Sequence, residues 1–265
     1  IVFGGKRHGR HGSARDQVLT DLWMLPLSGL LSSGNGRPLW TRGADFPGGH
    51  RWGITGVMVT GLNGREYLAV FGGRDLLPNY TTHSTAARAY RYYNEVWLYE
   101  PAMDAWTLVV PAPGTPVPSP RDHHAAAKFG GDMYIFGGRA AESTLASSVL
   151  NDLWSFSLRT NRWTNHLPNN GGAPSPRYMP GVAAVVWRNR TVIAVVGGET
   201  LPGTTKHTSR NDVWVYDFQD GPGWSELSAN DCSVEAVGVV EVAAMRGAVL
   251  PKVVAFGGGV VVVLF

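Results

Sequence analysis

The stretch that decides the fold is Tyr134-Ile135-Phe136-Gly137-Gly138, which is followed by Asn151-Asp152-Leu153-Trp154 and then by Trp163. A Gly-Gly pair follows an apolar run at five places: Gly4-Gly5, Gly72-Gly73, Gly137-Gly138, Gly197-Gly198 and Gly257-Gly258. A polar-acidic-aliphatic-Trp tetrad comes after four of these pairs and ends at Trp23, Trp97, Trp154 and Trp214. A second Trp follows each tetrad, at Trp40, Trp106, Trp163 and Trp224. The pairs are 60 to 68 residues apart, and such a period indicates repeated structural units.

Each unit is predicted to contain four short strands. The continuous apolar run before a Gly-Gly pair, such as Ile193-Ala194-Val195-Val196, has the length of a strand buried on both faces. After the tetrad, Trp154, Phe156 and Leu158 alternate with two serines, which indicates a strand with one apolar face. An opening strand after a recurring Arg and an outer strand near the second Trp complete the unit. No stretch shows helical periodicity with caps.

A four-stranded antiparallel unit of this size cannot bury both of its faces alone. Radial stacking covers each face with the neighbouring unit, which gives a β-propeller. Gly permits the positive φ that a buried strand needs where it turns near a crowded axis, and the Trp side chains fill the wedges between units. The Gly-Gly pairs, the Asn-Asp-Leu-Trp tetrads, the second Trp and Pro120-Arg121 together resemble kelch repeats. The resemblance implies an all-β, kelch-type β-propeller made of four-stranded antiparallel blades.

The repeats divide one propeller domain, residues 1–265, into units at about 1–46, 47–111, 112–168, 169–228 and, in part, 229–265. The first unit starts inside its second strand and the last stops soon after its Gly-Gly pair. About five repeat units with incomplete first and last blades are therefore expected. A closed ring completes one blade from both ends, but here both ends supply a second strand. We expect an incomplete ring, part of a six- or seven-bladed propeller, and a small five-unit ring with strained closure is the alternative.

Composition excludes several protein classes. Charged residues make up 16% of the chain, Gly accounts for 34 of 265 residues, and there are ten Trp. These values exclude a disordered tail, a coiled coil and a collagen-like rod. A single Cys excludes an intrachain disulfide and a Cys-based zinc site. The net charge of +3 is small for a nucleic-acid-binding protein, so no nucleic acid partner is expected.

Compartment and membrane contact follow from a few local features. The most apolar stretch, residues 247–265, contains Pro251 and Lys252 and is too interrupted for a membrane span. The lone Cys232 slightly favours a reducing, cytoplasmic compartment. Glycosylation sequons at Asn79 and Asn189 leave secretion open.

Long loops between the second and third strands of the units are predicted to begin directly after the Gly-Gly pairs and to share one face of the propeller. They comprise residues 6–20, 74–93, 139–150 and 199–210. They hold ten Lys or Arg and four Asp or Glu, whereas the whole chain carries only +3. Positive charge is therefore concentrated on that face, where Arg binds carboxylate or phosphate and Tyr offers rigid contact area. The candidate binding residues are Arg7, Arg10, Arg15, Arg74, Arg88, Arg91, Tyr92, Arg139, Lys206 and Arg210.

These residues predict a non-catalytic module that binds a protein partner with an acidic segment, and the resemblance supports this because kelch propellers commonly bind partners through loops on one face. The alternative is that the loops are simply solvated. Residues that recur with the units are interpreted as architecture, including Arg51, Arg121 and Arg177. The structural repeat residues are Gly4, Gly5, Trp23, Gly72, Gly73, Trp97, Gly137, Gly138, Trp154, Gly197, Gly198 and Trp214.

A propeller enzyme is the alternative function. Copper radical oxidases similar to galactose oxidase also use kelch-like blades, and they need a Tyr cross-linked to a Cys, a second Tyr and two His. No matching Tyr–His pair accompanies Cys232, so neither copper nor another cofactor is expected. A sugar-processing enzyme has no residue to support it. His8 and His11 have metal-like spacing but no Cys or carboxylate nearby, so no metal site is predicted.

Overall fold

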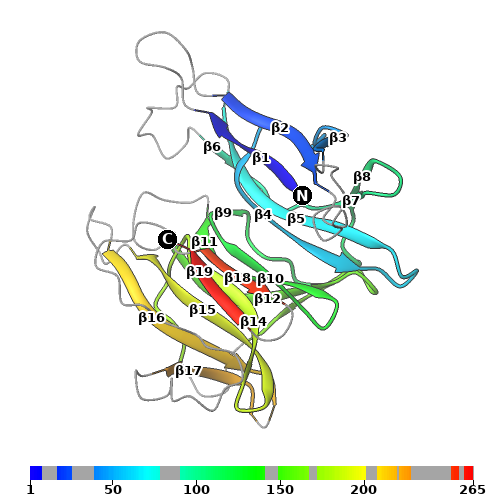
Figure 1. The fold of residues 1–265 in the computed structure, drawn as a ribbon. Coiled ribbons are helices and arrows are strands. Elements are labelled where there is room, and N and C mark those ends of the chain that lie inside the picture. The colour runs from blue at the N-terminus through cyan, green and yellow to red at the C-terminus, as the bar shows by residue number, and fades with distance from the viewer. Residues whose placement is uncertain are drawn as a thin grey trace.

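The computed structural model describes residues 1–7, 17–25, 39–77, 90–140, 149–166, 172–200, 208–219, 221–227, 252–256 and 260–264. These ranges contain β-strands and turns and no helix. A helix of the length and apolar character that a membrane crossing needs is accordingly absent from them. Figure 1 shows the strands grouped into separate twisted sheets, which we call blades and number in chain order.

The first two blades come from the N-terminal part of the chain. Blade 1 has three strands in the order β1-β2-β3: β1 (Val2–Arg7), β2 (Gln17–Met24) and β3 (Thr41–Gly43). Blade 2 follows the path β4-β5-β7-β8, and the short β6 pairs with the far end of β5. Its strands are β4 (Trp52–Thr60), β5 (Glu66–Leu76), β6 (Tyr90–Tyr92), β7 (Val96–Glu100) and β8 (Ala105–Val109).

Blades 3 and 4 repeat this four-strand path, and all pairs are antiparallel. Blade 3 contains β9 (Arg121–Asp122), β10 (Ala125–Phe129), β11 (Asp132–Ala140), β12 (Val149–Ser157) and β13 (Arg162–Asn165). Blade 4 contains β14 (Gly181–Trp187), β15 (Arg190–Thr200), β16 (Thr208–Asp217) and β17 (Gly223–Leu227). A last hairpin joins β18 (Lys252–Phe256) to β19 (Val260–Leu264). Three four-stranded antiparallel blades, with further antiparallel sheets on either side of them, confirm the predicted all-β blade architecture.

The blades pack face to face through their first strands. The first strands β4, β10 and β14 lie beside one another in that order, and β18 lies beside β14 (Figure 1). Backbone hydrogen bonds join neighbouring blades at this centre: the amide of His123 donates to the carbonyl of Gly53 at 2.8 Å, and the amide of Met179 donates to the carbonyl of His123 at 2.7 Å. Each blade is therefore fixed to the next by backbone as well as by side chains.

Hydrophobic clusters lie between blades 1 and 2, between blades 2 and 3 and between blades 3 and 4, and each of these three includes the second Trp of a unit. Trp163 lies between blades 2 and 3, Trp224 between blades 3 and 4, and Trp106 packs at the contact of blades 1 and 2. Burying such a ring contributes a large apolar area to each contact. Trp40 differs, because it precedes the short β3 and is 49% exposed.

The four Gly-Gly pairs that the structure describes lie inside strands rather than at strand ends, and Gly257-Gly258 lies outside the described residues. In blade 3 the pairing of β11 with β12 continues on both sides of the pair, with a bulge in the register at Gly137-Gly138. Gly137 has φ +66°, and a Cβ on it would lie 2.5 Å from the carbonyl oxygen of Arg177 in blade 4. Only Gly allows this close backbone approach. The prediction that long loops begin directly after the pairs is wrong, because the next residues, including Arg74 and Arg139, continue the strand.

Candidate functional site

A cluster of arginine, carboxylate and indole recurs at the same place in three blades. In blade 3, the buried Arg121 donates from Nη1 to Asp152 Oδ1 at 2.7 Å and from Nη2 to Asp152 Oδ2 at 2.8 Å. Its Nη1 also donates to the carbonyl of Gly137 at 3.0 Å. Trp154 Nε1 completes the cluster by donating to Asp152 Oδ2 at 2.7 Å. We call this arrangement the arginine cluster.

Blades 2 and 4 contain the same arginine cluster. Arg177 bonds both carboxylate oxygens of Asp212, at 2.6 and 2.8 Å, and Trp214 donates to the same carboxylate at 3.0 Å. Burial opposes ionisation of Asp212, but the hydrogen bond and charge of Arg177 hold its pKa below the usual range. In blade 2 the pair is Arg51 and Glu95, with Nη2 and Oε2 2.6 Å apart. In each of these blades the carboxylate therefore links the tetrad strand to the segment that opens the blade.

A second set of positions differs in chemistry from blade to blade. It consists of the residue after each cluster arginine and the residue after each Gly-Gly pair, which face each other as cross-strand partners. The partners are Trp52 with Arg74 in blade 2, Asp122 with Arg139 in blade 3, and Tyr178 with Glu199 in blade 4. We call these six residues the mouth cluster. Because they are the positions at which the repeat symmetry is broken, they are the best candidates for a functional site.

Asp122 is the centre of the mouth cluster. Its fully buried carboxylate accepts hydrogen bonds from Arg139 Nε at 3.3 Å and Arg139 Nη2 at 3.2 Å. Arg74 Nε lies 3.0 Å from Asp122 Oδ2, as an ion pair without hydrogen-bond alignment. His123 Nδ1 lies 2.6 Å from the same oxygen. Burial opposes ionisation of Asp122, but the hydrogen bond to His123 and the charges of His123, Arg139 and Arg74 outweigh it and hold its pKa at about 2.

Aromatic rings enclose both guanidinium groups. Arg74 Cζ lies 4.3 Å from the ring centre of Tyr90, 5.2 Å from that of Trp52 and 6.0 Å from that of Tyr92. Arg74 Nη1 also donates to the Tyr92 hydroxyl at 3.3 Å. Arg139 Cζ lies 4.6 Å from the ring of Tyr178 in the next blade. These contacts fix the orientation of both guanidiniums, since each cation–π contact contributes about 0.5–2 kcal/mol.

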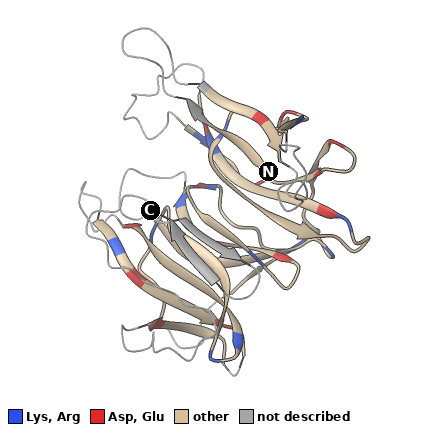
Figure 2. Ribbon diagram, in the orientation of Figure 1, with Lys and Arg blue, Asp and Glu red and all other residues tan. Residues whose placement is uncertain are grey.

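The mouth cluster ends at an acidic group in blade 4. The Tyr178 hydroxyl donates to Glu199 Oε2. Burial and this hydrogen bond raise the pKa of Tyr178, so the phenol stays protonated. The cluster therefore runs across three blades as alternating charges, and two guanidiniums share the single buried carboxylate of Asp122. Figure 2 shows blue segments at the strand ends of blades 2 and 3 that face each other.

The structure brings together three of the predicted binding residues, Arg74, Tyr92 and Arg139, and it places them on strands β5, β6 and β11. Arg91 is exposed on β6, with its guanidinium carbon 5.2 Å from the Tyr93 ring. Arg210 is exposed on β16. Arg7 ends β1, but its side chain lies outside the described residues, as do Arg10, Arg15, Arg88 and Lys206.

Asp122 is the central residue that the sequence interpretation missed. Its position directly after a cluster arginine, in a unit whose Gly-Gly pair is followed by Arg139, is the signal that identifies it. Counting charges by loop cannot find it, because Asp122 belongs to the opening strand of its blade and not to a loop between the second and third strands. The pairing becomes visible only when the register of β9 with β11 is known.

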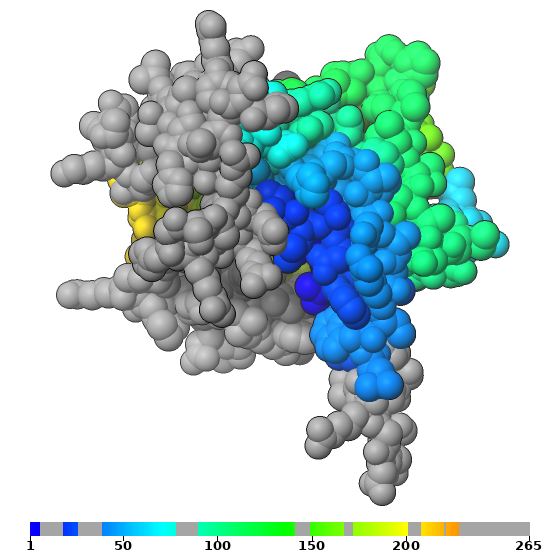
Figure 3. Space-filling model, turned by 90° about the horizontal axis from the view of Figure 1, so that it is seen from above, coloured from blue at the N-terminus to red at the C-terminus, as the bar shows by residue number. Residues whose placement is uncertain are grey.

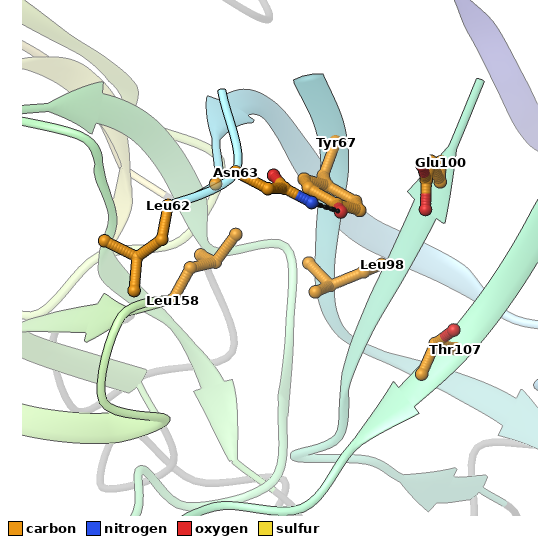
Figure 4. Close-up of a pocket in the computed structure, with 8 residues that line it drawn as sticks. Leu62, Asn63, Tyr67, Leu98, Glu100, Thr107 and Leu158 are labelled. Atoms are coloured by element: carbon orange, nitrogen blue, oxygen red, sulfur yellow. Dashed lines mark hydrogen bonds between the residues drawn. The ribbon is translucent and has the colours of Figure 1, made fainter. Parts of the chain in front are cut away.

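Neither a metal site nor the cavity found among the described residues provides a stronger candidate for a functional site. No group of three His, Cys, Asp or Glu side chains in it could hold a metal ion. A cavity of about 420 Å³ lies between blades 2 and 3, away from the mouth cluster. Figure 4 shows Leu62, Leu98 and Leu158 around it, with Asn63 donating to the Tyr67 hydroxyl at 2.9 Å. The lining is mainly apolar, and its one carboxylate, Glu100, forms an ion pair with Arg65.

Curated relatives resemble parts of this chain. The leucine-zipper-like transcriptional regulator 1 homolog of Drosophila melanogaster is 30% identical over 118 residues, which cover 44% of this chain and 11% of the relative. Human Kelch domain-containing protein 3 is 31% identical over 114 residues, 42% of this chain and 27% of the relative. Mouse Kelch domain-containing protein 1 is 24% identical over 136 residues, 51% of this chain and 30% of the relative. The chain thus matches less than a third of the length of these relatives.

A solved structure and a family description extend the comparison to most of the chain. The structure of YjhT matches with a TM-score of 0.55 at 18% identity, over 80% of this chain and 62% of that chain, and this likeness shows the fold. The KLHDC2/KLHL20/DRC7 Kelch-repeats domain matches residues 1–258. With its recurring arginine clusters and face-to-face blades, the chain therefore belongs to this kelch-repeat family and has the fold of a kelch β-propeller.

Proposed function

We propose that the chain is a non-catalytic interaction module that binds an acidic segment of a protein partner through the mouth cluster and the basic strands around it. The observation that carries this proposal is the sharing of one buried carboxylate, Asp122, by Arg74 and Arg139. Around Asp122 the two arginines leave one positive charge in excess, while Glu199, the other acid of the mouth cluster, accepts the hydrogen bond of Tyr178 in blade 4. Because the side chains of Arg74 and Arg139 are 16% and 21% exposed, that charge is accessible at the surface.

Rigidity of the two arginines also supports binding. A flexible surface arginine loses side-chain entropy when it binds a partner, at a cost of about 0.5–1.5 kcal/mol. Asp122 and the rings of Tyr90 and Tyr178 already hold both guanidiniums in place. Most of this side-chain entropy is therefore lost already when the chain folds. A carboxylate of the partner then finds hydrogen-bond donors in a fixed arrangement. Membership of the kelch-repeat family, whose domains commonly bind proteins, agrees with this role.

An array of synthetic 12-residue peptides containing Asp and Glu, each with a matched peptide containing Asn and Gln, tests the proposal on the full chain. Acidic members are expected to bind more tightly than their amide counterparts, with an affinity that falls as salt is added. The double variant Arg91→Glu/Arg210→Glu changes two exposed positions and is expected to weaken binding about tenfold. Arg139→Gln acts at the centre and is expected to weaken binding at least as much.

The matched control is Arg162→Glu, which reverses an exposed charge on the outer strand β13 of blade 3. It is expected to leave peptide binding within about twofold of the original protein. Arg162 pairs with Ser157, at the end of β12 opposite Val149, which is the partner of Arg139, and exposed charges that are far apart are screened. Equal binding of acidic and amide peptides across the array would refute the proposal. An equal loss of affinity in Arg162→Glu would show that net charge, and not the mouth cluster, is responsible.

A further inference from the structure

The contact between blades 3 and 4 is closed at one end by aromatic rings. Phe129, the last residue of β10, stacks on Phe218, which follows β16, with the ring centres 5.0 Å apart and the planes at 21°. Tyr134 and His166 of blade 3 also stack on each other, and the ring centre of each lies 5.4 Å from that of Phe218. These four rings fill the space between the two blades at this end.

The contact between blades 2 and 3 has smaller side chains at the same four positions. The positions correspond by their distance from the Gly-Gly pair, the tetrad Trp or the second Trp of their unit, or by their cross-strand partner. They are Val59 for Phe129, Ala69 for Tyr134, Val109 for His166 and Leu158 for Phe218. The cavity of about 420 Å³ lies at this contact, where it is lined by Leu158 and by Leu98, the cross-strand partner of Ala69. The absence of the four rings therefore explains why this contact is open and the next one is closed.

The cavity is open to solvent and has the size of a ligand site. Sites for small ligands in proteins measure about 300–1,000 Å³ and are mainly apolar, with a few polar groups. Leu62, in the hairpin between β4 and β5, lines the cavity and is 77% exposed. Figure 3 shows light-blue atoms of this part of the chain at the edge of the molecule. A small compound can therefore enter the cavity without separating the two blades.

A carboxylate with one free oxygen lies at one side of the cavity. The side chain of Glu100 is 18% exposed, and its Oε1 accepts a hydrogen bond from Arg65 Nη1 at 2.5 Å. Within the part of the chain that the structure describes, no donor is bonded to Oε2. Figure 4 shows Glu100 and Thr107 on the side of the cavity away from Leu158. Because hydrogen bonds to a carboxylate are strong, a ligand that fills this cavity is expected to carry a hydrogen-bond donor.

We propose that this cavity binds a small aromatic compound with one N–H donor, of the indole class. The ring packs between Leu98 and Leu158, and its N–H donates to Glu100 Oε2. An aromatic ring is the expected occupant because aromatic side chains hold the equivalent space between blades 3 and 4. An indole fits because its N–H bonds carboxylates elsewhere in this chain, as in the tetrads. The site is separate from the mouth cluster, since Tyr67, which lines the cavity, and Arg74 lie near opposite ends of β5.

Titration of indole into the full chain, followed by NMR of the leucine methyl groups, tests the proposal. The methyls of Leu98 and Leu158 are expected to shift in a saturable manner, and those of the buried Leu22 in blade 1 are expected to stay unchanged. Benzofuran is the matched probe, because it has the shape of indole with an oxygen in place of the N–H. It is expected to bind about tenfold more weakly, since the hydrogen bond to a charged group is lost. N-acetyltryptophanamide presents the same ring as part of an amino acid and is expected to bind more weakly than indole, because its amide groups lose water against an apolar lining.

Two variants change the cavity in different ways. Leu158→Phe gives blade 3 the ring that blade 4 has at this position, and it is expected to fill the cavity and abolish the saturable binding of indole. Glu100→Met removes the carboxylate but keeps an apolar side chain, so it is expected to bind indole and benzofuran with equal affinity. The matched control is Glu226→Met, on the exposed side of the outer strand β17, which is expected to keep the preference for indole. Thermal unfolding checks that each variant folds.

Absence of saturable shifts at Leu98 and Leu158 in the unmodified chain would overturn the proposal without reference to any variant. Equal affinity of the unmodified chain for indole and benzofuran would also overturn it, as would unchanged indole binding in Leu158→Phe. Tighter binding of N-acetyltryptophanamide than of indole would overturn the assignment to a small compound in favour of a Trp side chain of a partner. Arg139→Gln, which tests the acidic-partner surface, is expected to bind indole normally, so the two sites are judged separately.

Discussion

Replacement of Arg121 by Met removes the arginine cluster of blade 3 while keeping most of the side-chain volume. Arg121 is fully buried, and its guanidinium bonds Asp152, the carbonyl of Gly137 and both oxygens of Ser119. Breaking a buried ion pair by removing one partner costs about 3–5 kcal/mol. Because the side chain of Asp152 is 28% exposed, water solvates part of the charge left behind. The expected loss in free energy of unfolding is therefore near the lower end, about 3 kcal/mol.

Urea unfolding followed by Trp fluorescence measures this loss as a lower midpoint with an unchanged slope. Arg65→Met is the matched control, because Arg65 is 54% exposed and forms a surface ion pair with Glu100. Such a pair contributes only about 0–1 kcal/mol. The double variant Arg121→Met/Asp152→Leu is expected to lose less than the sum of its single variants, since it leaves no unpaired carboxylate. A loss in Arg121→Met no greater than in Arg65→Met would refute the reasoning.

Three further predictions concern single residues. Gly137→Ala, at φ +66° and with its Cβ 2.5 Å from a backbone oxygen, is expected to lose at least about 2 kcal/mol more in urea unfolding than Gly130→Ala, whose Cβ meets nothing within 4 Å. Asp122 has a pKa of about 2 in the folded protein, below its ordinary value near 4. Its charge therefore stabilises the fold above about pH 4, and this contribution is lost as the pH falls toward about 2. The difference in unfolding free energy between the original protein and Asp122→Asn is expected to shrink over that range. Burial lowers the pKa of His124 to about 3, so between pH 6.5 and 3 this residue takes up a proton only in the unfolded chain. The loss of stability on acidification is therefore expected to be smaller in His124→Gln. Equal slopes of unfolding free energy against pH in the two proteins would contradict the assignment.

The blade architecture could be predicted because its determinants are local and repeated. An apolar run, a Gly-Gly pair and an acid-containing tetrad place the second and third strands of a unit within a few residues of their observed bounds. In blade 3, the predicted apolar strand at Tyr134–Phe136 lies in β11, and the tetrad Asn151–Trp154 lies in β12. A pattern that recurs in several units is also less easily obscured by one irregular segment.

The Gly-Gly bulge could not be predicted from the chain alone. Gly before a polar stretch is typical of a strand end, and the sequence contains nothing that shows how close the next blade lies. The carbonyl of Arg177, 40 residues further along the chain, approaches Gly137 and makes Gly necessary inside the strand. This constraint comes from a residue far away in the sequence. It explains why Arg74 and Arg139, which were predicted in loops, lie on strands in the structure.

The mouth cluster could be anticipated only in part for a similar reason. Its two arginines, Arg74 and Arg139, and the neighbouring Tyr92 were among the candidate binding residues, because charge and aromatic content select such residues without any knowledge of packing. Asp122 was not, because its role depends on the contact between blades 2 and 3, which places it between the two arginines.

Packing of like-built blades around one centre is tested most directly by two backbone amides. The amide of His123 donates to Gly53 of blade 2, and the amide of Met179 donates to His123 of blade 3, so both bonds exist only if neighbouring blades meet as described. Residue-resolved hydrogen exchange by NMR is expected to show both amides exchanging slowly, together with the amides of β5, β11 and β15. Exchange of His123 and Met179 at the rate of unprotected amides, in a chain whose strands are protected, would contradict this packing.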